Sequence, residues 1–181
     1  MANKLGVNYE YLSDYNVGFT DSAAGATKAN TFYSDGANII FSVAGSVGDG
    51  VTSKAKEVKK LAIEVDANKD ENQPGYVLTS VLKNTEVPVY DIAEHYKNGT
   101  MNDVKGKALS YNLESKATGI TDLSIIESRV VESGKTKWDE IKTELEDISN
   151  KIASGEIKVT NAQAGEPFDK SSLTNVIMPN D

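Results

Sequence analysis

The chain has no cysteine, a single histidine and no long apolar run, and each absence excludes a class of protein. Without cysteine there is no disulfide, no thiolate metal site and no cysteine nucleophile. His95 has neither an imidazole partner for a metal site nor a nearby serine that suggests a catalytic triad. No segment approaches the ~20 apolar residues that cross a bilayer, and residues 1–20 lack the layout of a signal peptide.

Positive charge is also scarce. The formal net charge is −8, and all but one of the 19 basic residues are lysines scattered along the chain. Nucleic acid is bound by clustered lysines and arginines, so we expect no nucleic-acid partner. The 27 acidic residues form no pair that the sequence assigns to one cleft for acid–base catalysis. We therefore expect a protein that is not an enzyme and that holds no metal or cofactor.

What is present suits a globular α/β protein. The 181 residues, 39% of them hydrophobic, are enough for one sizeable core. Apolar, β-rich runs alternate with helical segments over residues 1–105, which predicts a doubly wound parallel sheet with helices on both faces. The expected strands are Tyr9–Val17, Ala37–Val43, Leu61–Val65 and Tyr76–Leu82; the expected helices follow the cap Asp21 as far as Gly36, run through VTSKAKEV (51–58), and span Glu86–Tyr96.

The pattern changes after residue 105. Gly106–Leu113 alternates as a strand would, and Thr121 with Asp122 can cap a short helix. Residues 136–153 form a long amphipathic helix, and 161–181 form a polar tail. The apolar stripe of the long helix must be buried against something; it consists of Trp138, Ile141, Leu145, Ile148 and Ile152.

The segment VDANKDENQPG (65–75) has three interpretations. Asp66, Asn68 and Asp70 occupy positions 1, 3 and 5 of a calcium loop. However, Glu71 stands where such a loop needs glycine, and Val77 stands where it needs a bidentate glutamate. The alternatives are an exposed polar loop and a strand end that presents one carboxylate to a ligand.

Ligands of open α/β sheets bind beyond the carboxyl ends of the strands. The loops expected there carry Phe19, the glycine loop Gly45–Gly50, Asp66, and Lys83 with Asn84. An aromatic plate, a carboxylate and a cation fit a small polar ligand with a flat ring and hydroxyl groups. The glycine loop by itself fits either a tight turn or a phosphate cradle, although it lacks the spacing of known phosphate motifs and Asp49 would repel an anion.

At these same loops the chain resembles the basic membrane protein family of bacterial lipoproteins. The runs that carry the resemblance are GFTDSAAGATKANTFYSDGANIIFSVAGSVGDGV (18–51), AIEVDAN (62–68), VLTSVLKN (77–84), VPVYD (87–91) and KIASGEIKV (151–159). The family comprises substrate-binding components of ABC importers, and its better understood members bind purine nucleosides. The resemblance therefore implies a nucleoside receptor whose partner is an ABC permease.

The resemblance also implies roles for single residues. Phe19 resembles the aromatic that stacks on the base, and the glycine loop resembles backbone packed closely against the ligand. Asp66 resembles the carboxylate that accepts ribose hydroxyls, and Lys83 the cation across the cleft. Asp66 is thus expected to face a ligand, and residues 68–73 are expected to form an exposed loop. The sequence departs from the family at Ser42, where a polar aromatic is usual, and at Asp49. The implied ligand-binding residues are Phe19, Gly45, Ser46, Gly48, Asp66 and Lys83.

Members of the family have two lobes of a type I periplasmic-binding-protein-like fold. The resemblance therefore implies that residues 1–105 are the C-terminal lobe and that residues 106–160 cross the hinge and return to an N-terminal lobe. An export signal and a lipidated cysteine are expected to precede that lobe and to anchor the protein outside the cytoplasm. In isolation, the chain is then expected to bind ligand weakly or not at all, and to pair with a second copy through the 136–153 helix.

Three other functions stay open at this point. A sugar receptor of the same architecture would use a strand-end aspartate in the same way. A flavodoxin-like domain would use the glycine loop for a phosphorylated cofactor, and a surface antigen or structural lobe would have no ligand.

Overall fold

A computed structural model describes residues 6–169, 171 and 173–177 of the chain. Its centre is a four-stranded sheet in the order β2-β3-β4-β5. The first three strands are parallel, and β5 is antiparallel to β4. The prediction of a parallel α/β fold is confirmed. The strands are β2 (Ile39–Phe41), β3 (Leu61–Asp66), β4 (Val77–Lys83) and β5 (Thr118–Ile120).

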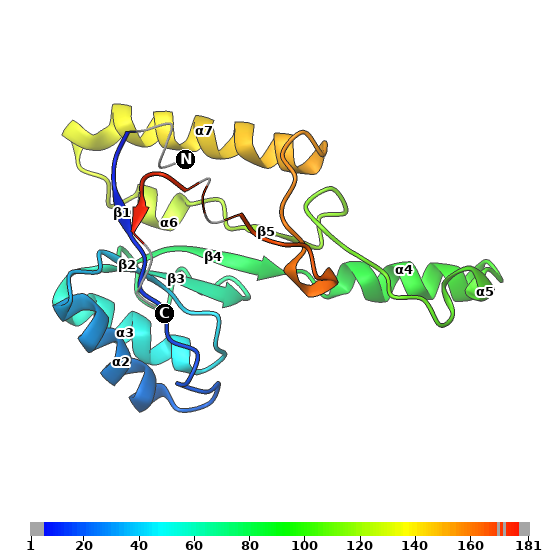
Figure 1. Ribbon diagram of the computed structural model, residues 1–181, viewed down its shortest axis with the longest axis horizontal. Coiled ribbons are helices and arrows are strands. Elements are labelled where there is room, and N and C mark those ends of the chain that lie inside the picture. Colours follow the sequence, from blue (N-terminus) through cyan, green and yellow to red (C-terminus); the bar gives the residue numbers. More distant parts are fainter. Residues whose placement is uncertain (1–5, 170, 172, 178–181) are drawn as a thin grey trace.

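Two helices, α2 (Ser22–Ser34) and α3 (Val47–Val58), pack against each other on one side of the sheet (Figure 1). The expected cap of α2 is present, because the Asp21 carboxylate accepts the backbone N–H of Ala24 at 3.0 Å. The main core lies between these helices and β3, where apolar side chains are removed from water. Its buried members are Ala29, Tyr33, Val47, Val51, Ala55 and Ala62.

Two glycines allow α2 and α3 to approach closely. A Cβ added at Gly25 would overlap the carbonyl oxygen of Val47, and one added at Gly50 would overlap the carbonyl oxygen of Ser22. Neither glycine has a positive φ, so the requirement is for space and not for an unusual backbone conformation. The distance between the two helices therefore depends on the missing side chains at these positions.

The next helix, α4 (Glu86–Lys97), has the predicted bounds to within a residue but does not pack on the sheet. It projects from the end of β4 together with the short α5 (Met101–Val104), and it has no buried residue (Figure 1). The chain returns from α5 to an antiparallel strand, so α4 is not a crossover between parallel neighbours and nothing in the topology holds it on a sheet face. The second face of the sheet is instead approached by α6 (Ser124–Glu127), which contacts β4.

Two predicted strands are wrong. Of Tyr9–Val17, only β1 (Tyr9–Glu10) is a strand, and it pairs with β6 (Val176–Ile177) in a separate parallel ribbon. Gly106–Leu113 forms no strand; the neighbour of β4 is β5, further along the chain. Alternating or β-rich sequence favours an extended chain, but a strand also needs a hydrogen-bonding partner, which the tertiary fold supplies elsewhere. Of the predicted tail, residues 170, 172 and 178–181 lie outside the described residues.

The long helix α7 (Lys135–Ala153) follows a 3-10 turn, η1 (Glu132–Gly134), and matches its prediction closely. Lys142 ties it to α6 by donating a hydrogen bond to Glu127 at 2.7 Å. None of its residues is buried, and Ile141 and Leu145 of the apolar stripe are 41% and 37% exposed. The described part of the chain thus leaves the stripe only partly covered. It also contains no helix with the length and apolar content needed to cross a membrane.

Replacing Gly50 by alanine tests the close approach of α2 and α3. Helix propensity alone favours alanine over glycine by about 1 kcal/mol. Because the new methyl group would overlap the Ser22 carbonyl, we expect Gly50→Ala to destabilise the protein by about 2–3 kcal/mol instead, measured by urea unfolding. The matched control is Gly119→Ala, which meets nothing within 4 Å. A more stable Gly50→Ala protein would refute this account of the helix packing.

Candidate ligand-binding site

A hollow of about 470 Å³ lies at the carboxyl ends of β2, β3 and β4, where the topology predicts a ligand. The chain supplies its walls from these strand ends, from the start of α4 and from the segment that leads into β5. The described residues that line it are Val43, Val65, Asp66, Val81, Leu82, Lys83, Asn84, Thr85, Pro88, Tyr111, Ala117 and Thr118.

Asp66 is the last residue of β3 and lies in this hollow. Its φ of 77° is in the left-handed region, which costs an L-residue roughly 1–2 kcal/mol although aspartate tolerates it better than most. Its exposed carboxylate has no hydrogen bond or ion pair with any described residue. A charged side chain is thus held free at a position where the backbone alone would favour glycine.

Lys83 is the last residue of β4 and lines the same hollow. The register pairs Asp66 with Leu82, so Lys83 is one place further along the neighbouring strand. Its ammonium group is also exposed and makes no hydrogen bond or ion pair within the described chain. The hollow therefore offers one unpaired anion and one unpaired cation from adjacent strands.

Phe19 and Gly45 lie beside each other, but neither lines the hollow. The carbonyl oxygen of Phe19 would be 2.7 Å from a Cβ at Gly45, whose φ is 49°, so only glycine fits here without strain. The Phe19 side chain is 69% exposed. Ser46 is the exposed N-cap residue of α3, and its side chain makes no capping bond. Val43, which precedes Gly45 by two residues in the sequence, does line the hollow.

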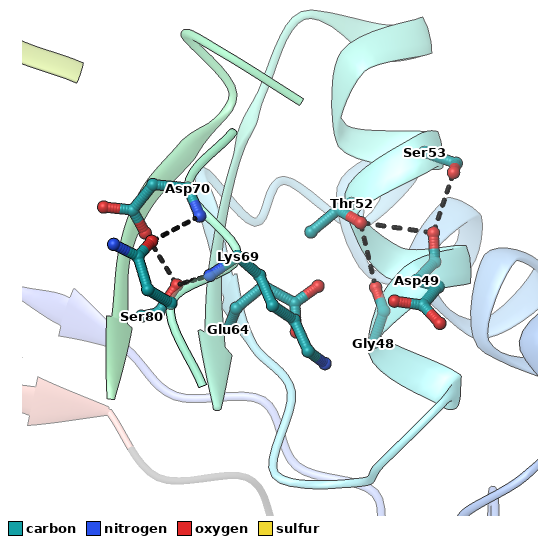
Figure 2. Close-up of polar contacts among 9 residues, drawn as sticks. Gly48, Asp49, Thr52, Ser53, Glu64, Lys69, Asp70 and Ser80 are labelled. Atoms are coloured by element: carbon teal, nitrogen blue, oxygen red, sulfur yellow. Dashed lines mark hydrogen bonds and ion pairs between the residues drawn. The ribbon is translucent and has the colours of Figure 1, made fainter. Parts of the chain in front are cut away.

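The glycine loop is shorter than predicted, because α3 begins at Val47 and not at Val51. Gly48 is therefore inside the first turn of the helix and buried, where a Cβ would lie 2.7 Å from Oε2 of Glu64 (Figure 2). Thr52 continues this turn by donating its hydroxyl to the carbonyl oxygens of Gly48 and Asp49. Gly48 thus packs against a side chain of the protein itself.

The loop from residue 67 to 76, which follows Asp66, is held against β4 by buried polar contacts (Figure 2). Asp70 is 1% exposed, and its Oδ1 accepts the Ser80 hydroxyl at 2.6 Å. The same Ser80 hydroxyl oxygen accepts the backbone N–H of Lys69 at 3.0 Å. The expectation of an exposed loop is wrong at Asp70, because a carboxylate in the middle of a polar run is indistinguishable by sequence from a solvated one. The described residues contain no group of three or more metal-ligating side chains.

A buried ion pair supports the loop from the other strand. Glu64 of β3 is fully buried, and its Oε2 accepts from Lys69 Nζ at 3.2 Å. Its other oxygen, Oε1, has no hydrogen-bond partner among the described atoms. Glu64 is not among the residues expected at the site, although a charged residue in the middle of an apolar strand was the available signal.

The remaining wall of the hollow is fixed by hydrogen bonds that engage three of its other polar side chains, whereas the Thr85 hydroxyl makes no capping bond. Asn84 donates its amide to the Lys116 carbonyl at 2.8 Å, and Thr118 donates its hydroxyl to the Leu82 carbonyl at 3.0 Å. The Tyr111 hydroxyl donates to Asp91 at 2.8 Å. This bond, with a smaller contribution from burial, raises the pKa of the Tyr111 phenol above its ordinary value. Asp66 and Lys83 are the charged groups that stay available.

A family model described as "ABC transporter substrate-binding protein PnrA-like" matches residues 3–163 of the chain. The chain belongs to this family. Its members are binding proteins and not enzymes, and the resemblance to basic membrane proteins is confirmed. The flavodoxin-like alternative thereby loses its support.

Several curated relatives support this family assignment. The chain is 29% identical to basic membrane protein D of Borreliella burgdorferi over 94% of its own length and 46% of the relative's. It is 30% identical to basic membrane protein A of Borreliella afzelii over 95% and 50% of the two lengths. A third relative, the ABC transporter nucleoside-binding protein BmpA of Lactococcus lactis, is 31% identical over 54% of this chain and 32% of its own. The chain thus spans about half the length, or less, of the curated relatives it matches.

Solved structures support the fold. The chain superposes on an ABC transporter solute-binding protein from Aeropyrum pernix K1 with a TM-score of 0.71 and 24% identity. The match covers 94% of this chain and 52% of the solved one. The chain therefore has the fold of part of a solute-binding protein.

Replacing Lys69 by methionine tests the buried ion pair. It would leave the Glu64 carboxylate buried without a counter-charge, so we expect a loss of about 3 kcal/mol in the free energy of unfolding. Lys137→Met removes the same charge from an exposed pair with Glu140, and we expect a loss of no more than about 0.5 kcal/mol. Adding Glu64→Gln to Lys69→Met should restore part of the stability. Equal losses in the two single variants would contradict this role of Glu64 and Lys69.

Proposed function

We propose that this protein is the solute receptor of an ABC importer and that its ligand is a nucleoside, with a purine base preferred. The observation that carries the proposal is the hollow in which Asp66 and Lys83, both without a partner in the described chain, lie at the ends of adjacent strands. Family membership and the name of the relative from Lactococcus lactis support the same ligand class.

The chemistry of the site suits a ribose. A carboxylate accepts two hydroxyl protons at once, so Asp66 can bind a vicinal diol by two charge-assisted hydrogen bonds. Lys83 can donate to acceptor atoms elsewhere on the same ligand. Phe19 offers an exposed aromatic face to a base, next to the close turn at Gly45. Ser46 has a free hydroxyl beside them, and Gly48 supports the helix start from behind.

The hollow is open, and we propose that a second lobe closes it. A binding protein gains affinity when closure excludes water from charged contacts. In this proposal the complete protein is a lipoprotein held outside the cytoplasm by its anchor, and it delivers the ligand to an ABC permease. Residues 106–160 connect the two lobes.

A sugar receptor is the second candidate. It is favoured by the same observation, because an unpaired strand-end carboxylate binds the hydroxyls of a hexose equally well. The two candidates differ in the need for a flat base.

Calorimetric titration of inosine, adenosine and guanosine into the complete natural protein that contains this chain tests the proposal. Hydrogen bonds to a charged group contribute about 1.5–3 kcal/mol each, so we expect Asp66→Gly to weaken binding at least tenfold. Glycine is chosen because it accepts the φ of 77° without strain, so the variant should be as stable as the natural protein.

The matched control is Glu71→Ala, which removes the same charge from an exposed position of the following loop. We expect it to bind as the natural protein does. Binding of a hexose with no response to the three nucleosides would favour the sugar receptor. Nucleoside binding that survives Asp66→Gly would remove Asp66 from the site.

We also infer that the chain of 181 residues pairs with a second copy through α7. Its apolar stripe is half-exposed, and the described residues provide no further cover. A two-fold pair would bury the stripe of each copy against the other.

Light scattering coupled to size-exclusion chromatography measures this pairing. We expect the 181-residue chain to elute as a dimer and Leu145→Lys to shift it to a monomer, because the substitution puts a charge into the stripe. Thr143→Lys adds the same charge on the opposite side of the helix and should leave the dimer intact. A monomeric natural chain would refute the pairing.

A further inference from the structure

We propose that Tyr111 is a ligand-contact residue whose ring, held by the hydrogen bond from its hydroxyl to Asp91, forms the aromatic wall of the hollow. This inference rests on the proposed function and deepens it. It adds a second aromatic contact for the flat base, besides Phe19, from a residue outside the strand ends.

Tyr111 is the single aromatic side chain among the described residues that line the hollow. It comes from the irregular segment between α5 and β5, which a strand prediction had covered. Phe19, the aromatic expected from the sequence, lies beside Gly45 and outside this lining. A base bound next to Asp66 and Lys83 would therefore meet the ring of Tyr111.

One hydrogen bond holds the side chain of Tyr111, and two others hold the backbone that follows it. Its hydroxyl donates to Asp91 of α4 at 2.8 Å. Further along the same segment, Asn84 donates its side-chain amide to the Lys116 carbonyl at 2.8 Å and its backbone N–H to the Ala117 carbonyl at 2.9 Å. A side chain that is already ordered loses little conformational entropy when a ligand binds, so its contact contributes more fully to affinity.

The hydrogen bond from the hydroxyl to Asp91 also decides which part of Tyr111 a ligand can contact. Because the phenol is engaged with Asp91, the ring itself is what remains for contact. The same bond raises the pKa of the phenol. An aromatic ring without a free polar group recognises a flat base by stacking or edge contact and gives nothing to a sugar hydroxyl.

The hollow then makes two kinds of contact with the ligand. Asp66 responds to the ribose hydroxyls, and Tyr111 responds to the base. Loss of the ring should lower the affinity for every nucleoside while leaving the discrimination between ribose and deoxyribose unchanged. A purely structural role of Tyr111 would disturb both properties, because a collapsed wall would also displace Asp66.

The experiment measures adenosine and 2′-deoxyadenosine affinities by calorimetry in the complete natural protein that contains this chain. Stacking of a base on an aromatic residue is worth about tenfold or more in affinity. We expect Tyr111→Leu to weaken both ligands by that factor and to leave their affinity ratio unchanged. Tyr111→Phe keeps the ring and should lose about threefold or less.

Asp91 is a positioning residue in this scheme. We expect Asp91→Ala to lower affinity as much as Tyr111→Phe does, and Asp91→Asn, which keeps an acceptor oxygen, to restore it. The matched control is Tyr96→Leu, which makes the same change at a side chain of α4 that is 80% exposed and does not line the hollow. It should bind both ligands normally.

The outcomes are distinguishable. Unchanged affinity in Tyr111→Leu, or a loss equal to that of Tyr96→Leu, would overturn this inference and leave the nucleoside receptor standing. A lower affinity accompanied by a changed ratio would assign Tyr111 a structural role and would also overturn it. If the natural protein binds no nucleoside, the proposed function fails and this inference fails with it.

Discussion

The structure depends on how the chain returns from β3 to β4. Parallel neighbours need a connection that runs back along the sheet, which is usually a helix. Here a loop without a helix makes the return, and buried polar contacts hold it in place: Asp70 with Ser80, and Glu64 with Lys69. Because this loop fixes the two strands side by side, their last residues open into the same hollow. The shape of the candidate site thus depends on contacts within the protein and not on contacts with a ligand.

The sequence predicted the main strands and helices of this arrangement well. Apolar runs and helical periodicity are local signals, so β3, β4, α2 and α7 were found close to their observed bounds. The rule that ligands bind beyond the carboxyl ends of parallel strands then selected Asp66 and Lys83, which the structure brings into one hollow. The order and direction of the strands were sufficient to locate these two residues, because they do not depend on the details of the side chains.

The errors have a common cause in contacts between segments distant in the sequence. Gly48 was assigned to a loop, but it packs against Glu64 in the first turn of a helix. Tyr111 was assigned to a strand, but its hydroxyl binds Asp91 and its segment stays irregular. Asp70 was expected in solvent, but it is buried and accepts a hydrogen bond from Ser80. No local pattern carries the identity of such partners, so propensity alone could not reveal them.

The left-handed backbone at the end of β3 also restricts how the protein can diverge. Among residues with a side chain, aspartate and asparagine are the ones that adopt this conformation most readily. A lineage that keeps this turn can therefore exchange Asp66 for an amide far more easily than for a larger or branched group. An amide donates as well as accepts, so that single exchange would admit ligands that present an acceptor where the proposed nucleoside presents its ribose hydroxyls. The geometry of one peptide unit thus limits which side chains can take the place of Asp66.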